Sequence, residues 1–173
     1  PEKTSITVNL DDELDNQLKK VRDLTLRASV FLSYRREDRS IAEKVATSLR
    51  ADDFGVFFDL DSLSTTASDF LSTNEAALRD ALKRGAVVAL LSRETLRSLW
   101  VVAELEAAFR LAGENRGSIV PVSIQPREFV LENSPVELRC QLEAVQWVDL
   151  SVDFGAGMKR LKQGLRALDY RVG

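Results

Sequence analysis

Residues 28–38 read Ala28-Ser29-Val30-Phe31-Leu32-Ser33-Tyr34-Arg35-Arg36-Glu37-Asp38. The first part of this stretch is an apolar run of the length expected for a parallel strand that is buried on both faces. The second part is polar and charged, and it leads into apolar side chains at helical spacing between Ile41 and Leu49. We therefore predict a strand at 28–33, followed by a helix that Asp38 or Ser40 caps and that ends near Ala51.

The alternation of strand and helix continues to the end of the chain. Further strands are predicted at 56–58, 86–92, 118–123 and 145–148, and further helices at 69–83, 96–112 and 154–168. Gly85 and Gly113 are expected to end two of these helices, and 125–143 is expected to be irregular apart from one short helix near 136–142. Five short strands that alternate with helices predict a doubly wound α/β domain with a largely parallel sheet.

The composition excludes several classes of active site. The 173 residues contain no His and a single Cys, Cys140. This excludes His-ligated zinc, catalytic triads that need a His, and an internal disulfide framework, so no metal site is predicted. Any catalysis must rest on carboxylates, hydroxyls, Lys, Arg or backbone amides, and Cys140 is expected to be a small core residue.

The charge balance argues against nucleic acid or an anionic membrane as a partner. The chain has 24 basic and 27 acidic residues, a net charge of −3, which leaves no strong positive field. No apolar run approaches the ~20 residues that span a bilayer, and no signal peptide opens the chain. We expect a cytoplasmic protein. Because the chain begins with Pro1 rather than Met, we expect a fragment or a trimmed product.

Residues 1–27 differ from the remainder of the chain. A short alternating run at 5–10 precedes a charged stretch in which Leu14, Leu18, Val21 and Leu24 recur at helical spacing. We predict a lead-in helix or a linker from an upstream domain. The pattern also resembles the first strand and helix of ribbon-helix-helix DNA binders, but a core strand follows where the second helix would be needed, so DNA binding is not favoured.

Polar residues concentrate in three segments that follow predicted strands, 33–38, 59–68 and 92–104. In doubly wound sheets, ligands bind beyond the carboxyl ends of the strands. Trp100 and Glu104 are four residues apart in the third segment, so they share one face of the predicted helix. An aromatic plane beside a carboxylate at the mouth of the sheet suits a flat base joined to a ribose.

Four motifs carry a family resemblance. They are Val30-Phe31-Leu32-Ser33-Tyr34-Arg35-Arg36-Glu37-Asp38, Val56-Phe57-Phe58-Asp59, Ser98-x-Trp100-x-x-x-Glu104-Leu105 and Ile119-Val120-Pro121-Val122. In this order and at this spacing they resemble the Toll/interleukin-1 receptor (TIR) domain family, of the bacterial kind, over about residues 28–170. The resemblance implies a flavodoxin-like sheet of strand order 2-1-3-4-5 with helices on both faces. It divides the chain into the lead-in segment 1–27 and a TIR domain at 28–173.

The resemblance implies one of two activities. Many TIR domains cleave the nicotinamide–ribose bond of NAD+ and release nicotinamide with ADP-ribose or a cyclic variant, so NAD+ is a substrate and no cofactor is expected. The enzymatic members carry a glutamate at the place of Glu104. They act after self-assembly with other TIR domains, here within a larger defence or toxin-like protein. The alternative is a non-catalytic TIR–TIR interaction module, either a signalling scaffold or a mimic of host signalling.

Each site residue has an expected role. The Glu104 carboxylate would stabilise the positive ribosyl centre that forms as nicotinamide leaves. Trp100 would stack on a base, and Arg35 with the backbone around Ser33 would hold the diphosphate. Ser98 is expected to cap the helix of Glu104. The substrate-binding set also includes Tyr34 and Asp61.

Simpler interpretations compete with these roles. Glu104 could be a surface glutamate in the first turns of a helix, Trp100 could be a core residue, and at least one of Arg35 and Arg36 is expected to be a solvated charge. A response-regulator receiver would carry its phosphorylated Asp where Ser92 stands, so that class is not favoured. The 59–68 loop lacks the Gly and Pro that many family members have, which leaves its part in assembly and basal activity open.

Overall fold

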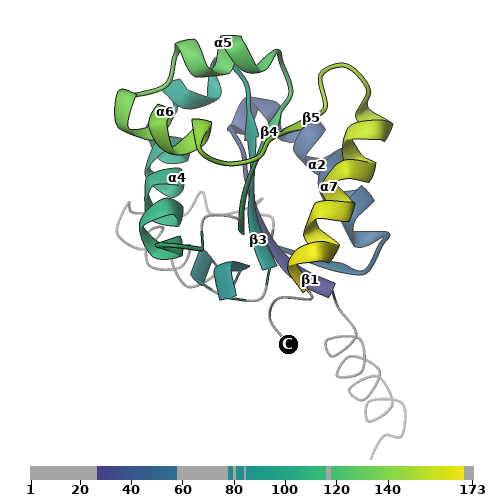
Figure 1. Ribbon diagram of the computed structural model, residues 1–173. Coiled ribbons are helices and arrows are strands. Elements are labelled where there is room, and N and C mark those ends of the chain that lie inside the picture. The colour runs from purple at the N-terminus through teal and green to yellow at the C-terminus, as the bar shows by residue number, and fades with distance from the viewer. Residues whose placement is uncertain (1–26, 58–77, 80, 84, 116–117, 170–173) are drawn as a thin grey trace, which may run out of the picture.

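A computed structural model of the chain describes residues 27–57, 78–79, 81–83, 85–115 and 118–169 (Figure 1). Almost all of the predicted lead-in segment and the whole 59–68 loop, with Asp61, lie outside the described residues. Backbone is described at positions 27, 28, 100 and 169, but their side chains are not.

The core of the fold is a parallel sheet of five strands in the order β2-β1-β3-β4-β5. The strands are β1 (Arg27–Ser33), β2 (Phe54–Phe57), β3 (Gly85–Leu91), β4 (Ile119–Ser123) and β5 (Val148–Asp149). This order confirms the predicted flavodoxin-like topology. All carboxyl ends of the strands meet at one edge of the sheet, because every neighbouring pair is parallel.

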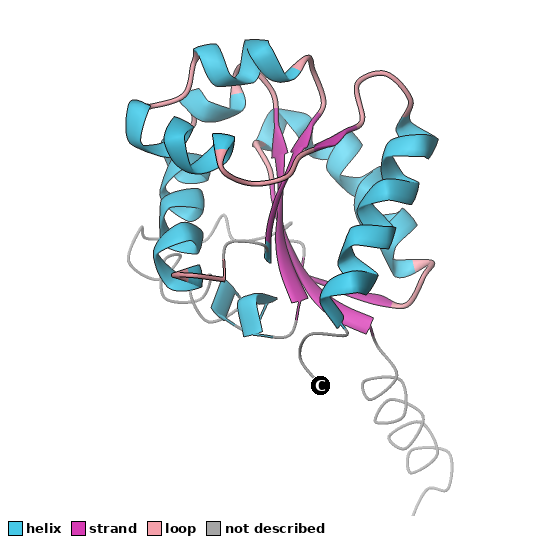
Figure 2. Ribbon diagram, in the orientation of Figure 1, coloured by secondary structure: helices cyan, strands magenta, loops and turns pink. Residues whose placement is uncertain are grey.

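Helices cover both faces of the sheet (Figure 2). They are α2 (Arg39–Arg50), α4 (Leu99–Ala112), α5 (Arg127–Glu132), α6 (Val136–Glu143) and α7 (Phe154–Asp169), with 3₁₀ turns η1 (Arg36–Asp38) and η2 (Thr95–Arg97). Helices α2 and α7 lie on one face, and α4, α5 and α6 lie on the other (Figure 1). None of the helices in the described part of the chain is both long and apolar enough to cross a membrane.

Strand alternation divides the core into two clusters and gives Ser33 its direction. Val30 and Leu32 of β1 pack on the α2–α7 side, whereas Phe31 packs on the α4 side. Successive side chains of a strand point to opposite faces, so Ser33, two residues after Phe31, points toward α4. The burial pattern of the first strand therefore aims its last hydroxyl at one helix.

Packing explains where the structure departs from the predicted elements. Gly85 follows the helical residues 81–83, as predicted, but it also begins β3. It lies opposite Ser29 of β1, where a side chain would collide with the Ser29 carbonyl oxygen. The segment expected to be irregular contains the additional helix α5, anchored by the buried Val130. Cys140 is exposed and not a core residue, because Leu138 and Leu142 occupy the buried face of α6.

Replacement of Gly85 tests the close approach of β1 and β3. We expect Gly85→Ala to lower the free energy of unfolding by about 1–3 kcal/mol, the usual cost of overpacking a core, as measured by urea denaturation. Gly164→Ala is the matched control, because a Cβ at Gly164 meets no atom within 4 Å. In the interior of α7 it should stabilise the protein by about 0.5–1 kcal/mol. Equal effects of the two changes would contradict this account.

Candidate active site at the carboxyl ends of β1 and β3

A carboxylate and a hydroxyl meet at the carboxyl edge of the sheet. The Oγ of Ser33, the last residue of β1, donates a hydrogen bond of 2.6 Å to Oε2 of Glu104 in α4. Ser33 is only 2% exposed, and Glu104 is half-buried. The two residues are 71 positions apart in the chain, so only the fold brings them together.

The pattern of α4 explains why Glu104 faces the sheet. Val101, Leu105 and Ala108 are all buried against the α4-side core. Glu104 lies between them at the i+3 position of an i, i+3, i+4, i+7 stripe, which is the buried face of an amphipathic helix. The following acid, Glu106, is exposed. Glu104 is therefore held partly inside, unlike a solvated surface glutamate.

The contact orients the carboxylate. A serine hydroxyl carries one proton, and the proton of Ser33 is directed at Oε2. Hydrogen bonds to an ionised acceptor are short and strong, which fits the 2.6 Å separation. A carboxylate fixed in this way supplies a preorganised negative charge at the mouth of the sheet, where it can stabilise a developing positive charge.

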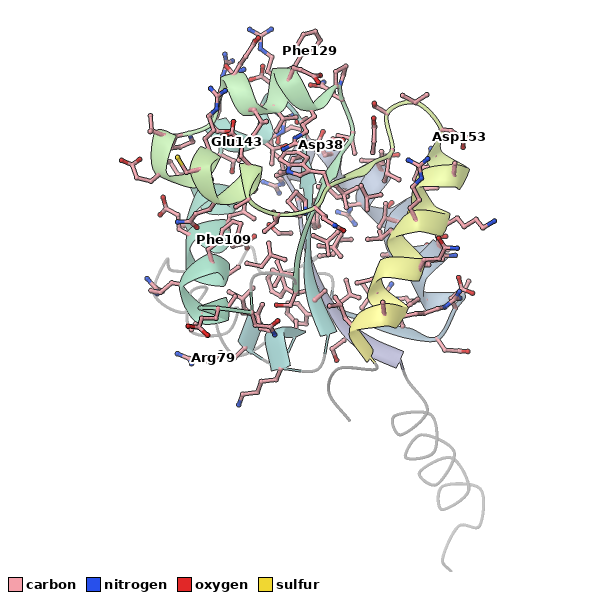
Figure 3. The ribbon with its side chains drawn as sticks, in the orientation of Figure 1. Asp38, Arg79, Phe109, Phe129, Glu143 and Asp153 are labelled. Carbon is pink, nitrogen blue, oxygen red and sulfur yellow. The ribbon has the colours of Figure 1, made fainter. Side chains whose placement is uncertain are left out.

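A second polar cluster lies close to this pair in the fold. Oδ2 of Asp38 is 3.3 Å from Oγ of Ser92 and 3.5 Å from Oγ1 of Thr95. Ser92 and Thr95 are buried, and their hydroxyl oxygens are 2.7 Å apart. Figure 3 shows Asp38 at the end of the sheet that also carries Asp153 of the β5–α7 turn, with Arg79 at the opposite end.

The two predicted helix caps take a different form. Asp38 and Ser98 stand at the N-cap positions of α2 and α4, but neither side chain makes a capping hydrogen bond. The carboxylate of Asp38 is turned across to Ser92 instead. Ser98 acts through its backbone: its N–H donates to the Thr95 carbonyl, and its own carbonyl accepts from Val102 N–H.

Arg35 and Tyr34 lie apart from the Ser33–Glu104 contact. Nε of Arg35 is 3.3 Å from both Glu37 Oε2 and Asp38 Oδ2, so this guanidinium is paired within its own loop. Tyr34 packs against the core cluster on the α2–α7 side, the opposite face from Glu104. The structure thus joins Ser33 with Glu104 and leaves these two candidates in the adjoining turn.

Two further candidates cannot be placed in the same way. The backbone of Trp100 lies in the first turn of α4, one turn before Glu104, but its side chain is outside the described atoms. Asp61 lies outside the described residues altogether. A hollow of about 540 Å³ opens beside the same sheet edge, between α2 and the start of α7. Its lining includes Asp38, Lys44 and Phe154 but neither Ser33 nor Glu104.

Comparison with known proteins identifies the family. A family model described as "TIR domain" matches residues 30–162. The chain belongs to the TIR domain family. Among solved structures, the TIR domains of the activated Roq1 resistosome, which directly recognises the pathogen effector XopQ, match with 20% sequence identity and a TM-score of 0.46, covering 83% of this chain and 84% of that chain. A search of curated proteins gives no match.

Sequence reasoning missed part of the polar machinery of this TIR domain. The sequence predicts Asp38 only as a helix cap and predicts no role for Thr95. The signal for both was weak, because an acid before a helix and a threonine in a loop are common. Ser92 was noticeable as a polar residue after the most apolar strand, yet its partner in another loop became visible only in the fold.

The carboxyl end of β5 carries a separate acid with a shifted pKa. The Ser151 hydroxyl and the Ser151 backbone N–H donate to Oδ1 of Asp149 at 2.6 Å and 2.7 Å. These hydrogen bonds lower the pKa of Asp149 below its ordinary value of 3.8. A carboxyl whose pKa is depressed in the fold stabilises the protein above its unfolded pKa and loses that contribution as the pH falls.

The Ser151→Ala variant tests this cause. We expect the pKa of Asp149 to rise toward 3.8, as measured by NMR titration of the carboxyl carbon. The stability difference between the wild type and the variant should be largest near neutral pH and should shrink below the ordinary pKa, since protonation removes the charge that strengthens these hydrogen bonds. An unchanged titration of Asp149 would contradict the assignment.

A double-mutant cycle tests the Ser33–Glu104 contact. We expect Ser33→Ala to lower the free energy of unfolding by about 1–2 kcal/mol, because it removes a donor to a charged acceptor. Combined with Glu104→Ala, the two changes should show a coupling energy of about 1 kcal/mol in urea denaturation. Additive effects would mean that the hydrogen bond does not hold Glu104 in solution.

Proposed function

We propose that this TIR domain cleaves the nicotinamide–ribose bond of NAD+. The observation that carries the proposal is the contact between Ser33 and Glu104, a carboxylate held half-buried at the carboxyl edge of a doubly wound sheet. Ligands bind at this edge in sheets of this kind. The Ser98-x-Trp100-x-x-x-Glu104 motif, which resembles that of the NAD+-cleaving members of the family, supports the same conclusion.

The reaction suits a chain without histidine. Nicotinamide is attached to ribose as a cationic pyridinium and leaves as a neutral molecule, so no acid has to protonate it. The C1′–N bond breaks with its electron pair going to nicotinamide. The oxygen of a water molecule then bonds to C1′ and releases a proton. The products are nicotinamide, ADP-ribose and H+.

Glu104 is proposed as the catalytic residue. The ribosyl centre resembles an oxocarbenium ion as the C1′–N bond breaks, and a carboxylate is the usual group that stabilises such a centre. Ser33 is proposed to act on Glu104 rather than on the substrate, because its hydroxyl donates to that carboxylate and the residue is almost fully buried. A fixed charge stabilises the transition state without reorganising during the reaction.

The remaining candidates keep proposed substrate-binding roles. Trp100, one turn before Glu104 on α4, would stack on a base of NAD+. Arg35 and the start of α2 would hold the diphosphate. In the free protein, the guanidinium of Arg35 pairs with Asp38. Tyr34, Asp61 and Ser98 complete the proposed set around the substrate.

Assembly with other TIR domains is proposed as the activating step. The family resemblance implies it, since many members act only when neighbouring copies complete the site. Cleavage by this chain should therefore rise more steeply than linearly with protein concentration. The wider setting that we propose is a larger defence or toxin-like protein.

The second candidate function is a non-catalytic TIR–TIR interaction module. The observation that favours it is a set of exposed apolar side chains on the helices and turn around the carboxyl edge of the sheet. These are Leu99, Phe129, Val136 and Val152. Large apolar side chains that remain exposed can mark a contact surface, and contacts through them require no catalysis.

Substitution of Glu104 separates the two candidates. We expect concentrated wild-type protein to release nicotinamide from NAD+, and Glu104→Gln to reduce the rate by about 100-fold or more, as for loss of a preorganised charged group. Chromatography of nicotinamide and of the linear or cyclic ADP-ribose product measures both. Gln keeps the size of the side chain and an acceptor for Ser33, so the fold should survive.

Glu106→Gln is the matched control, because Glu106 is an exposed acid on the same helix. It should keep the wild-type rate. Equal rates for wild type and Glu104→Gln would remove Glu104 from the mechanism. If the wild type self-associates but releases no nicotinamide at high concentration, only the interaction module remains as a candidate function.

A further inference from the structure

We infer that Asp38 is a positioning residue for Glu104, acting through Ser92 and Thr95. The inference rests on the proposed cleavage of NAD+ and extends it, because neither the sequence motif nor the Ser33–Glu104 contact assigns Asp38 a part in the reaction. It starts from the position of Asp38, an acid at the N-cap of α2 whose side chain does not cap that helix. Its carboxylate instead accepts a hydrogen bond from Ser92, in the loop that follows β3.

The hydroxyl protons of the cluster need an acceptor outside the Ser92–Thr95 pair. Ser92 N–H donates to Oγ1 of Thr95 at 2.7 Å. Each hydroxyl has one proton, and the two hydroxyl oxygens are 2.7 Å apart with either one as the donor. The remaining proton goes to Asp38 Oδ2, which is 3.3 Å from Ser92 Oγ and 3.5 Å from Thr95 Oγ1. The chain of hydroxyls therefore ends on a carboxylate, and that acceptor is needed to orient it.

A cation and two hydroxyls surround the carboxyl group of Asp38. Its side chain is only 14% exposed, and Nε of Arg35 lies 3.3 Å from Oδ2. Hydrogen bonds to a carboxylate are stronger than those between neutral groups. The buried hydroxyls of Ser92 and Thr95 would otherwise lack this acceptor, and unsatisfied buried polar groups are costly.

The cluster and the Ser33–Glu104 contact join the same two segments of the chain. Ser33 and Asp38 lie at the two ends of the turn after β1. Thr95 and Glu104 lie on the segment that runs from η2 into α4. Two cross-links between two segments close a ring, so α4 cannot shift along the sheet without breaking one of them.

Backbone hydrogen bonds connect Thr95 to the first turn of the helix that carries Glu104. The Thr95 carbonyl accepts from Ser98 N–H at 3.0 Å, and the Ser98 carbonyl accepts from Val102 N–H at 3.1 Å, which starts the regular helix that carries Glu104. A displacement at Asp38 thus reaches Thr95 through side-chain hydrogen bonds and continues from Thr95 into α4 through the backbone. Misplacement of a catalytic group by about 1 Å can cost about 100-fold in rate.

The test compares Asp38→Asn with Asp52→Asn. Both remove one negative charge and keep the size of the side chain. At position 38 the amide can still accept a hydrogen bond, but it is a weaker acceptor than a carboxylate and loses the ion pair with Arg35. Like Asp38, Asp52 forms ion pairs, in its case with Lys162 and Arg166. These pairs link the α2–β2 turn to α7 and do not involve α4. We expect Asp38→Asn to lower kcat for nicotinamide release by about 10- to 100-fold with KM for NAD+ within about twofold of wild type. Asp52→Asn should keep the wild-type kcat.

A second pair of variants is used if circular dichroism shows that Asp38→Asn does not fold. Thr95→Val removes the buried hydroxyl with little change of volume, whereas Thr95→Ser keeps the hydroxyl. We expect a lower kcat for Thr95→Val and recovery of most of the wild-type kcat in Thr95→Ser. A role in stability alone would not produce this rescue in kcat at temperatures where both variants are fully folded.

The outcomes separate this inference from the proposed function. Wild-type protein is assayed first, and no release of nicotinamide there would defeat the proposed function and this inference together. If the wild type is active and Glu104→Gln is not, the proposed function stands. An unchanged kcat in Asp38→Asn, or a raised KM with kcat retained, would then overturn the positioning role alone. The latter result would make Asp38 a substrate contact.

Discussion

The hydrogen bond between Ser33 and Glu104 is the interaction on which the functional interpretation depends. It joins the last residue of the first strand to the second turn of a helix that follows the third strand in the sheet order. A lone glutamate on a helix has many rotamers, and its charge is screened by water. Held by a buried hydroxyl, the same carboxylate has a fixed direction, which is what electrostatic catalysis requires.

The sheet supplies the rigidity that this contact needs. Strands β1 and β3 are hydrogen-bonded neighbours, and Ser33 is paired in register with Ala89. All residues of β3 are buried, so the base of the site is core and not loop. Polar side chains beyond these two strand ends are therefore presented by a well-packed support, while the specificity of the site is left to the loops.

Much of this TIR domain could be anticipated because its main signals are local. Apolar runs of strand length separated by helical spacing identified the alternation, and the motifs around Ser33 and Glu104 identified the family that the family model confirms. Packing between distant segments is not visible in local signals. Gly85 follows a helix as predicted, but the close approach of β1 and β3 at this residue is seen only in the fold. The prediction of Cys140 as a core residue from its type is wrong, because the neighbouring leucines take the buried face.

The sequence by itself determined the parallel sheet, its strand order through the family resemblance, and the residue types available for chemistry at its carboxyl edge. These properties follow from the spacing of apolar residues within short segments and from the residue types that the chain contains. Only the tertiary structure decided that the Ser33 hydroxyl meets Glu104 and that Asp38 turns away from its own helix toward Ser92. Such contacts join residues 71 and 54 positions apart, and no local pattern specifies which of many polar side chains will be brought together when the strands pack.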